Sequence, residues 1–415
     1  MTKENKIAII GLGYVGLPLA IAFSKYYKVI GFDIDTDRVN ELNDSVDSNA
    51  DISFEINKNI KFTDKENDLI VANIYIITVP TPVTSKNIPD LSILERATKT
   101  VATYLRKGDI VIYESTVYPG VTEDICVPIL EKLSGFKYNT DFYCGYSPER
   151  ISPGAEKYTL QNVVKITSGS NDEIADEINH LYQKVISVGT YEAPSIKVAE
   201  AAKVVENTQR DVNIALMNEL AMMFDKMNIE TSEVLNAART KWNFLDFKPG
   251  LVGGHCIGVD PYYLLHKSEK MGYKPTLLHS SRTINNKVAA FVVDKTISLL
   301  EDQKISVDNS QVLILGYTFK ENCADTRNTK VKDIVDGLKN VSSNISIYDP
   351  YLSESSDNNF ISNPFVSEEK YDAIILAVAH NEFLKYSIDD FHNLSKGKLV
   401  FLDLKGIYKE SSWKL

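Results

Sequence analysis

Three features that would each point to a particular class of protein are scarce in this sequence. Only 4 cysteines occur among 415 residues, without a CxxC spacing, so a disulfide framework is not expected. Lysine and arginine, 45 in all, are outnumbered by 56 acidic residues, which disfavours the basic surface that nucleic acids and anionic membranes attract. No apolar run reaches the roughly 20 residues of a membrane helix, and the first residues lack a secretory signal. We therefore expect a reduced, cytoplasmic protein that binds neither nucleic acid nor membrane.

The order of strand-like and helix-like runs predicts an α/β fold. In the first 190 residues, short β-branched or aromatic runs alternate with helical stretches such as Leu17–Tyr26 and Leu91–Leu105. Buried strands that alternate with helices indicate a parallel sheet covered on both faces. The predicted strands are Lys6–Ile10, Lys28–Phe32, Ile74–Thr78, Asp109–Tyr113 and Phe142–Tyr146.

A long helix and a second α/β pattern follow. The segment Ser195–Met227 has neither Gly nor Pro and carries apolar residues at helical spacing. Another helical stretch lies near Ser281–Leu300, and further strands are predicted at Gln311–Leu315, Ile345–Tyr348, Ala373–Val378 and Leu399–Leu402. We predict two Rossmann-like doubly wound domains, residues 1–194 and 305–415, joined by a central helical domain, residues 195–304. The cleft between two such domains is the default ligand site.

A glycine-rich turn follows the first predicted strand. Gly11, Gly13 and Gly16 form a GxGxxG pattern that serves a tight turn, close approach of a pyrophosphate and close helix packing, in that order. The helix N-terminus adds N–H donors and a positive dipole end. Asp33 ends the next strand, where a carboxylate accepts from the ribose hydroxyls of NAD and repels the 2′-phosphate of NADP. We predict NAD, with Arg38 packed on the adenine rather than accommodating NADP; a glycine turn without a ligand is the alternative.

The segment from Gly253 to Pro261, GGHCIGVDP, holds the one cysteine with neighbours suited to chemistry. A buried cysteine is ordinarily inert packing. Glycines around Cys256, however, leave room for a substrate, and Asp260 could act on a water or orient a neighbour. No second cluster with zinc spacing accompanies His255, so we expect no metal.

The predicted long helix and three loops offer further polar candidates. Lys203 and Asn207 are four residues apart and share a helix face, where together they could stabilise an oxyanion or merely form a solvated stripe. Loops at Val79–Pro82, Ser115–Val117 and Ser147–Arg150 follow first-domain strands, at the sheet edge where ligands bind. Glu149 is a candidate base, and a surface salt bridge is its alternative role.

These residues fall in motifs that resemble the UDP-glucose/GDP-mannose dehydrogenase family along nearly the whole chain. GLGYVGLPLA, VPTP, EST, YSPER, AAKVVEN, GGHCIGVDPYYL and GYTFKENCADTRNTK occur in the family's order. The resemblance implies an NAD-dependent, four-electron oxidation of the C6 alcohol of a nucleotide sugar to a carboxylate. It further implies that Cys256 holds the aldehyde as a thiohemiacetal and then a thioester, which water hydrolyses.

The resemblance also implies roles for individual residues. Lys203 and Asn207 would hold the oxyanion, Glu149 and Thr116 would assist as base and water holder, and Asp260, Glu149 or both would activate the water. Arg239 would cross to the substrate of a neighbouring subunit, which implies a homodimer with the long helix at its core. The cofactor-binding residues would be Gly11, Gly13, Tyr14, Val15, Gly16, Asp33, Arg38, Thr81, Pro82, Thr116 and Arg327. The substrate-binding residues would be Glu149, Arg150, Lys203, Asn207, Arg239, Phe247, Gly250, Gly253, Tyr317 and Lys320.

Substrate choice within the family is the finer question. The stretch from Ala238 to Leu264 is most similar to the UDP-N-acetylhexosamine 6-dehydrogenases of Vi-antigen and O-antigen synthesis, which favours UDP-N-acetylglucosamine, with its galacto epimer as an alternative. Pro153 stands where UDP-glucose enzymes have a second glutamate, so a two-carboxylate hydrolysis is in doubt. Space for a 2-acetamido group is expected near Arg150 and Phe247. A UDP-glucose 6-dehydrogenase, a two-electron dehydrogenase and a non-catalytic nucleotide-binding protein are the competing hypotheses.

Overall fold

The computed structural model describes residues 5–47, 52–150, 159–341, 344–352 and 359–415. By its internal contacts the chain groups into two compact units. The first comprises Met1–Glu206 and Tyr262–Tyr273, and the second comprises Asn207–Pro261 and Lys274–Leu415. The predicted α/β fold with parallel sheets and a central helical region is confirmed; the domain bounds 1–194, 195–304 and 305–415 stay a prediction.

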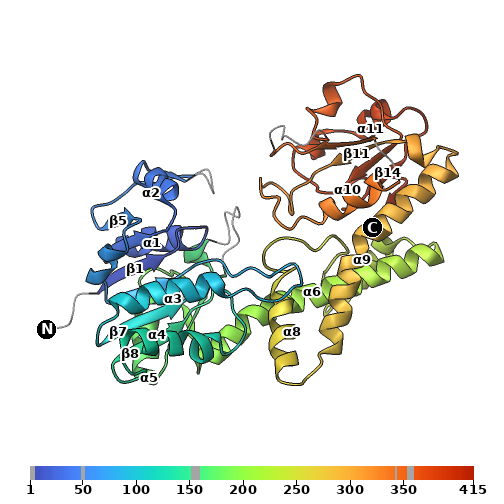
Figure 1. Cartoon of the computed structure of the whole chain (residues 1–415). Helices are drawn as coiled ribbons and strands as arrows, with labels where there is room; N and C mark the ends of the chain where they lie inside the picture. Colours follow the sequence, from blue (N-terminus) through green and yellow to red (C-terminus); the bar gives the residue numbers. More distant parts are fainter. Residues whose placement is uncertain (1–4, 48–51, 151–158, 342–343, 353–358) are drawn as a thin grey trace. The chain divides into compact units, whose positions relative to one another are not determined.

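The first unit is built on a six-stranded parallel sheet (Figure 1). Its strand order, β5-β2-β1-β6-β7-β8, is the doubly wound order 3-2-1-4-5-6 when the strands are counted along the chain. The direction of winding reverses between β1 and β6, so the loops that leave these two strands form the switch point where such folds bind ligands. The strands are β1 (Lys6–Ile10), β2 (Lys28–Phe32), β5 (Ile60–Thr63), β6 (Ile74–Ile77), β7 (Asp109–Tyr113) and β8 (Phe142–Tyr146).

Helices cover both faces of this sheet. Side chains such as Ile7, Ile9 and Ile112 share one buried cluster with residues of α1 and α5. The opposite face meets α3, where the Tyr75 hydroxyl donates to the Tyr104 carbonyl at 3.1 Å. The helices are α1 (Gly16–Ser24), α2 (Thr36–Asn43), α3 (Ser92–Tyr104), α4 (Val127–Ser134), which continues a π-helical turn at Thr122–Cys126, and α5 (Asp172–Gln183).

Short strands complete this unit. They are β3 (Val46–Asp47), antiparallel to β4 (Ile52–Ser53), and β9 (Lys165–Thr167), parallel to β10 (Thr190–Glu192). The sequence pattern did not predict these four strands or β5, because runs of two to four residues with Lys, Thr and Asp show no clear periodicity.

A long helix runs from the first unit into the second. It is α6 (Ile196–Met227), and the division between the units falls within it, after Glu206. In the second unit α6 packs against α9 (Thr276–Asp302) through ion pairs such as Lys295 with Asp225 at 2.8 Å. The shorter helices are α7 (Thr231–Ala238) and α8 (Asp260–Lys270).

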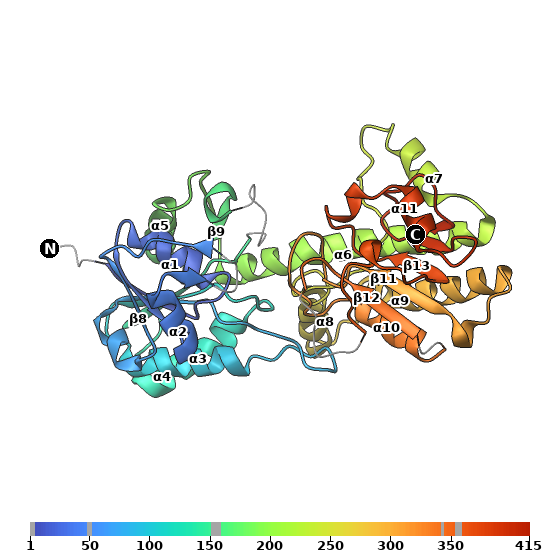
Figure 2. The same ribbon diagram turned by 90° about the horizontal axis from the view of Figure 1, so that it is seen from above.

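The second unit ends in a five-stranded parallel sheet of order β12-β11-β13-β14-β15 (Figure 2). Its strands are β11 (Gln311–Leu315), β12 (Asn344–Tyr348), β13 (Ala373–Leu376), β14 (Phe401–Asp403) and β15 (Trp413–Lys414). One face packs with α9 and α10 (Val331–Lys339), and the other with α11 (Ile388–Leu394). The winding reverses between β11 and β13, which makes a second switch point at this sheet.

Among the helices in the described parts of the chain, none is both long enough and apolar enough to cross a membrane.

Candidate active site

The three glycines of the first turn have distinct surroundings. Gly11 adopts a φ of +93°, and a Cβ on Gly16 would lie 1.9 Å from the Gly11 carbonyl oxygen, so the turn and the helix packing both require glycine. Thr78 at the end of β6 donates its hydroxyl to the Gly11 carbonyl at 2.7 Å. Gly13 is exposed, and a Cβ there would meet nothing within 4 Å. The backbone is therefore open at the position where a pyrophosphate would approach.

The amide and the carbonyl of Leu12, inside this turn, are each held by a charged side chain. Asp33 accepts the Leu12 N–H at 2.7 Å, and its carboxylate is half-buried at the end of β2. Arg38 donates to the Leu12 carbonyl through Nε at 3.1 Å and Nη2 at 3.0 Å. Arg38 is buried and also pairs with Asp47 at 2.7 Å and Glu41 at 3.0 Å. The structure thus gives Arg38 a place in shaping the turn, while its contact with the adenine stays a prediction.

These residues fit NAD. A glycine-lined turn with an open side, a helix N-terminus behind it and a half-buried carboxylate at the end of the second strand match the pyrophosphate and the ribose. Ile34, next to Asp33, is 76% exposed, and sequence reasoning did not single it out. Tyr14 and Val15 in the turn are half-buried.

Two loops after β6 and β7 are joined at the same edge of the sheet. The Thr81 hydroxyl donates to the Thr116 carbonyl at 2.6 Å, and the Ser115 hydroxyl donates to the Val79 carbonyl at 2.6 Å. Tyr263 of α8 donates to the Thr81 carbonyl. Pro82 is exposed beside them. The predicted cofactor loops therefore lie together, and a tyrosine two residues after the Cys256 segment anchors one of them.

Glu149 meets Lys203 in the first unit. Lys203 is 4% exposed, and its Nζ donates to the Glu149 carbonyl at 2.7 Å and lies 3.4 Å from Oε2. Within the described residues, Oε1 of Glu149 is buried without a hydrogen-bond partner. Arg150 pairs with Glu206 at 2.8 Å and donates to the Val164 carbonyl at 2.6 Å. The candidate base is thus next to a buried ammonium and has one oxygen atom left to accept a proton.

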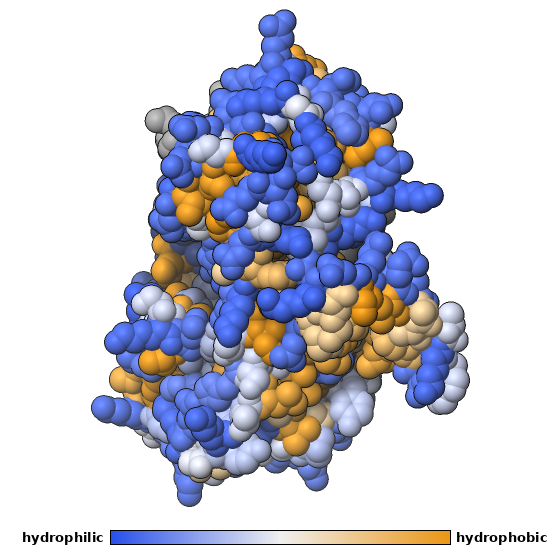
Figure 3. Space-filling view, turned by 90° about the vertical axis from the view of Figure 1, so that its right-hand side faces the viewer, coloured by the Kyte–Doolittle hydropathy of each residue, from blue (hydrophilic) through white to orange (hydrophobic). Residues whose placement is uncertain are grey.

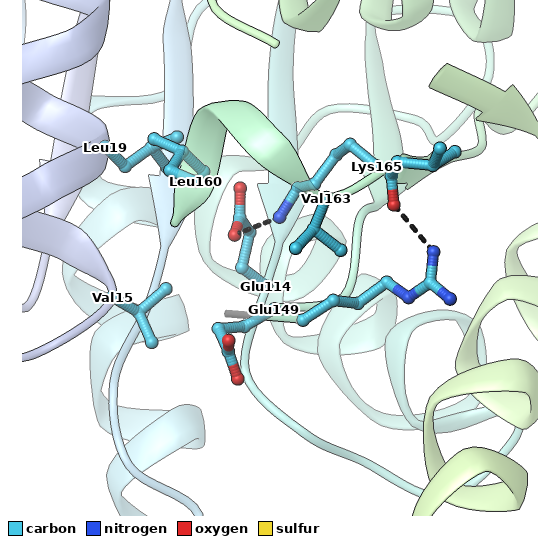
Figure 4. A pocket seen from close by; sticks show the side chains of 9 residues that line it. Val15, Leu19, Glu114, Glu149, Leu160, Val163 and Lys165 are labelled. Atoms are coloured by element: carbon cyan, nitrogen blue, oxygen red, sulfur yellow. Dashed lines mark hydrogen bonds and ion pairs between the residues drawn. The ribbon is translucent and has the colours of Figure 1, made fainter. Parts of the chain in front are cut away.

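A pocket opens beside this carboxylate (Figure 4). Figure 4 shows an apolar wall from the glycine turn and α1 opposite an ion pair between Glu114 and Lys165. Its lining residues are Val15, Leu19, Glu114, Glu149, Arg150, Leu160, Val163, Val164 and Lys165.

Cys256 lies in the second unit with two of its predicted partners. The thiol-bearing residue is exposed, and its carbonyl accepts the N–H of Asp260 at 2.8 Å. The Asn207 amide donates to the Asp260 carboxylate at 2.6 Å, and Asp260 is 2% exposed at the start of α8. The backbone of the cysteine, a buried carboxylate and an amide of α6 are therefore in one hydrogen-bonded group. Lys203, one helical turn before Asn207, is on the same face of α6.

The glycines before Cys256 have a packing role. A Cβ on Gly253 would lie 2.6 Å from the Asn328 carbonyl oxygen, and a Cβ on Gly254, whose φ is +81°, would lie 2.7 Å from the Phe319 ring. The glycines let the cysteine loop pack closely against residues 317–329. Room for a substrate beside the thiol stays a prediction.

The remaining predicted substrate residues in this unit lie on two loops. Tyr317 and Lys320 are half-buried in the loop after β11, with the Lys320 ammonium 5.5 Å from the centre of the Phe319 ring. The amide of the Asn218 side chain binds Gly250 on both sides, accepting its N–H at 2.8 Å and donating to its carbonyl at 3.0 Å. Phe247 is half-buried in the same loop.

The two predicted arginines each have a neighbouring carboxylate. Arg239 contacts Asp246, and Arg327 forms a two-point pair with Asp325 at 3.0 and 2.8 Å. Burial, followed by the positive charge of Arg327, lowers the pKa of His255, so this imidazole is neutral at pH 7. Their roles toward substrate and cofactor stay predictions.

Sequence reasoning missed two buried polar groups next to these loops. Lys165 and Glu114 form an ion pair beside Glu149, and Tyr182 donates to Glu114. In the second unit, Asp211 pairs with Arg282, and Asn285 joins Asp211 to Asn218. A charged residue inside an apolar strand or helix could have indicated such a buried group. Its partner could not be identified, however, because the two members of each pair are 50 or more residues apart in the sequence.

The order of the first sheet, the NAD-fitting turn and the exposed cysteine beside a carboxylate define a nicotinamide-dependent dehydrogenase. Three parts of the chain match family models of the UDP-glucose/GDP-mannose dehydrogenases: residues 5–186 the NAD binding domain, 197–287 the central domain and 313–410 the UDP binding domain. The chain belongs to the UDP-glucose/GDP-mannose dehydrogenase family. It is an NAD-dependent oxidoreductase whose C-terminal part is a UDP-binding domain.

Relatives match over nearly the whole chain. The UDP-N-acetyl-D-glucosamine 6-dehydrogenase of Salmonella typhi is 52% identical over 408 residues, which cover 97% of this chain and 96% of that one. The protein of the same name from Pseudomonas aeruginosa is 49% identical, with 98% of each chain covered. The solved structure of the UDP-N-acetyl-D-mannosamine dehydrogenase of Pyrococcus horikoshii is 32% identical and superposes with a TM-score of 0.88 over 99% of this chain and 98% of that one.

Proposed function

We propose that this protein oxidises the C6 hydroxyl of UDP-N-acetylglucosamine to a carboxylate with two NAD per sugar, for the synthesis of a surface polysaccharide such as a capsule or O-antigen. The observation that carries the chemistry is the exposed Cys256, hydrogen-bonded through its backbone to the buried Asp260, which Asn207 holds at 2.6 Å. The relatives at 52% and 49% identity support the choice of the UDP-N-acetylglucosamine substrate.

Bound NAD supplies the acceptor for both hydrides. In the first oxidation C6 gives up a hydride and its hydroxyl gives up a proton. The proposed acceptor of this proton is Oε1 of Glu149, which has no hydrogen-bond partner among the described residues. The Cys256 thiolate then adds to the aldehyde carbon, and the oxygen of the resulting thiohemiacetal carries the developing charge. Lys203 and Asn207 are the proposed donors to that oxygen.

The second oxidation and the hydrolysis complete the reaction. Loss of a second hydride from C6 leaves a thioester on Cys256, which retains the substrate while its carbon changes oxidation state. Water attacks the thioester carbon, the C–S bond breaks, and the thiol is regenerated as the uronate leaves. Asp260 or Glu149 takes the proton from the water, and Thr116 is the proposed residue that holds this water.

A panel of UDP-sugars distinguishes this function from its competitors. Absorbance at 340 nm and mass spectrometry of the product are measured with UDP-N-acetylglucosamine, its galacto and manno epimers and UDP-glucose. We expect two NADH per molecule of UDP-N-acetylglucosamine and a uronate product. One NADH per sugar would indicate a two-electron dehydrogenase. A preference for UDP-glucose or for an epimer would show that this sugar, and not UDP-N-acetylglucosamine, is the substrate. No NADH with any of the sugars would refute the proposal that the protein oxidises UDP-sugars.

Cys256→Ser tests the role of the thiol. A serine hydroxyl lacks the low pKa and the reactivity of a thiol, so no thioester forms and net uronate formation stops. NAD binding, which depends on the first unit, should stay within about twofold of the wild type, because an exposed side chain changes by one atom. Cys323→Ser is the matched control, and it should retain turnover. Uronate formation at the wild-type rate in Cys256→Ser would refute the covalent mechanism.

We further propose a homodimer through α6. Apolar side chains recur along α6 in steps of seven and four residues, at Val205, Val212, Leu216, Met223 and Met227. Four of them are 41–54% exposed, which makes a long apolar stripe along the helix. The side of the molecule at which α6 ends carries apolar patches among hydrophilic side chains (Figure 3). A second copy of the same helix offers a stripe of matching length, and Arg239 would then reach the substrate of the neighbour.

The oligomeric state tests this proposal. Leu216→Lys with Met223→Lys places two charges on the stripe, and light scattering after gel filtration should change from dimer to monomer mass. Met271→Lys, at a side chain that is 75% exposed but not on α6, is the control and should stay dimeric. A wild-type monomer, or a double variant that stays dimeric, would contradict an α6 interface.

A further inference from the structure

A buried lysine that takes no part in the proposed chemistry lies next to the candidate base. Lys165 begins β9, and only 4% of its side chain is exposed. Its ammonium donates to the Glu114 carboxylate at 2.6 Å, to the Pro148 carbonyl at 2.9 Å and to the Ser147 carbonyl at 3.4 Å. An ammonium has three donors, so all three are used within the protein.

Glu114 holds this ammonium in place. One of its carboxylate oxygens faces Lys165, and the other accepts the hydroxyl of Tyr182. Burial and the charge of Glu114 raise the pKa of Tyr182 well above its ordinary value, so the hydroxyl keeps its proton and remains a donor. Glu114 directly follows β7 and stands two residues before Thr116. The ion pair therefore joins the end of β7 to the loop that leaves β8.

The tethers surround Glu149 on both sides. Lys165 donates to the carbonyls of Ser147 and Pro148, the two residues before Glu149. Lys203 donates to the carbonyl of Glu149 itself at 2.7 Å. The next residue, Arg150, donates in the opposite direction to the Val164 carbonyl at 2.6 Å. Figure 4 shows the Glu114–Lys165 pair and Glu149 around the same pocket. The three consecutive carbonyls from Ser147 to Glu149 are thus fixed by charged side chains.

Stability alone is a weak reason for such a pair. Burying two charges costs desolvation, and well-packed apolar residues of similar volume often serve a core equally well or better. What an apolar pair cannot supply is a set of directed donors to the carbonyls of a loop. Displacing a catalytic group by about 1 Å can reduce a rate about 100-fold, so a rigid backbone under Glu149 has catalytic value.

We propose that Lys165 is a positioning residue for Glu149: its ammonium, held by Glu114, fixes the carbonyls of Ser147 and Pro148 and so sets where the Glu149 carboxylate lies. This inference rests on the proposed function, because it assumes that Glu149 takes the proton. In this proposal Glu114 orients Lys165, and neither residue of the pair contacts the substrate directly.

The test removes the tether without leaving a buried charge alone. Lys165→Met combined with Glu114→Gln deletes both charges and keeps an amide oxygen for the Tyr182 hydroxyl. We expect kcat to fall about 10- to 100-fold, while the Kd for NAD and the KM for the UDP-sugar change less than about threefold. Tyr182→Phe is the matched control in the same cluster, because it removes a hydroxyl but leaves every bond from Lys165 to the loop. Its kcat should stay within about twofold of the wild type.

A double-mutant cycle separates positioning from general damage. If Lys165 acts through Glu149, the Lys165→Met/Glu114→Gln change should have almost no further effect on kcat in a Glu149→Gln background. Three results would each overturn the inference. The kcat of Lys165→Met/Glu114→Gln could stay within threefold of the wild type, or Tyr182→Phe could lose as much kcat as this double variant. The third such result is that the double change reduces kcat as much in the Glu149→Gln background as in the native one.

Failure of the proposed function is recognised separately, in the wild-type enzyme. If the wild type does not oxidise UDP-N-acetylglucosamine, the function is wrong as to its substrate, and the cycle is measured with the UDP-sugar that the wild type does oxidise. If the wild type oxidises no UDP-sugar, both proposals fall.

Discussion

The two parallel sheets place an aspartate at equivalent points and use it in different ways. Asp33 follows β2 and Asp349 follows β12, each the neighbour of the first strand of its sheet. Asp33 is half-buried and accepts the N–H groups of Leu12 and Asp35, one on each carboxylate oxygen. Asp349 is 2% exposed and accepts the N–H groups of Tyr317, Thr318 and Tyr351.

A histidine explains the difference. His380 follows the strand at the second switch point, and its Nε2 lies 3.0 Å from Asp349. Its Nδ1 accepts the N–H of Asn322 at 2.9 Å, which assigns the proton to Nε2 and makes it a donor to the carboxylate. Asp349 is therefore fully used in fixing the loop that carries Lys320. One doubly wound topology thus yields a carboxylate that can bind a ribose and one that builds a loop, so function must be argued from the site.

The largest effect on the free energy of unfolding is expected for Asp349→Ala, compared with Asp33→Ala. Removal of the carboxylate leaves three N–H groups, of which that of Thr318 is buried, and a buried imidazole without their acceptor, which we expect to cost about 3–5 kcal/mol of unfolding free energy. Denaturant unfolding of the full chain measures it, with Asp33→Ala as the matched variant, expected to lose about 1 kcal/mol or less. Equal losses in the two variants would remove the distinction between them.

Glu200 extends the comparison to a buried carboxylate that backbone N–H groups hold. It accepts the N–H groups of Gly120 at 2.5 Å and Thr122 at 2.9 Å, and burial raises its pKa to about 7. A folded-state pKa above the unfolded value of 4.5 means that the folded chain holds the extra proton, so stability falls as the pH rises from 4.5 to 7.

The measurement is the difference in unfolding free energy between wild type and Glu200→Gln at several pH values. Relative to the variant, the wild type should lose about 3 kcal/mol between pH 4.5 and pH 7.5, and the difference should then level off. A difference that is independent of pH would show that the Glu200 carboxylate is ionised at its ordinary pKa.

Asp349 differs from Glu200 in the direction of its pKa shift. Hydrogen bonds from His380 and backbone N–H groups outweigh the effect of burial and lower the pKa of Asp349, so its contribution to the free energy of unfolding is lost only in acid.

The third and smallest effect is expected on nucleotide binding, when Asp33 is replaced. Asp33→Ala should weaken NAD binding about 10- to 100-fold, because hydrogen bonds to a charged acceptor contribute about 1.5–3 kcal/mol. NADP binding should change little, since repulsion of the 2′-phosphate is lost together with the hydrogen bonds. Titration with both nucleotides decides this point. A loss of affinity that is equal for NAD and NADP would indicate that Asp33 acts only by holding Leu12.

Apolar strands could be predicted from the sequence, whereas the short strands with several polar residues could not. The bounds of β1, β2, β7, β8 and β11 agree with those expected, because each is a run of five residues with mostly buried apolar side chains. β9 has three residues and begins with Lys165, which no periodicity identifies as buried. Its partner Glu114 is 51 residues away, so only the fold reveals the pair.

The candidate site was predictable in its residue types rather than in its contacts. The spacing of Gly11, Gly13 and Gly16 sets their surroundings locally, and the turn has the expected form. The packing of Gly253 and Gly254 could not be predicted, because the atoms that require a glycine there, on Asn328 and Phe319, come from a distant loop. Local chemistry is readable from a motif, but close packing between loops is a property of the folded chain.

The most direct test of the account is the mass of the intact protein during turnover. Asp260→Asn should slow hydrolysis, so mixing this variant with NAD and UDP-N-acetylglucosamine should accumulate the thioester. The account predicts an added mass equal to the UDP-sugar less four hydrogen atoms, located on the peptide that contains Cys256. Continued NADH formation with no such adduct, or with the adduct on another residue, would contradict the central role of Cys256.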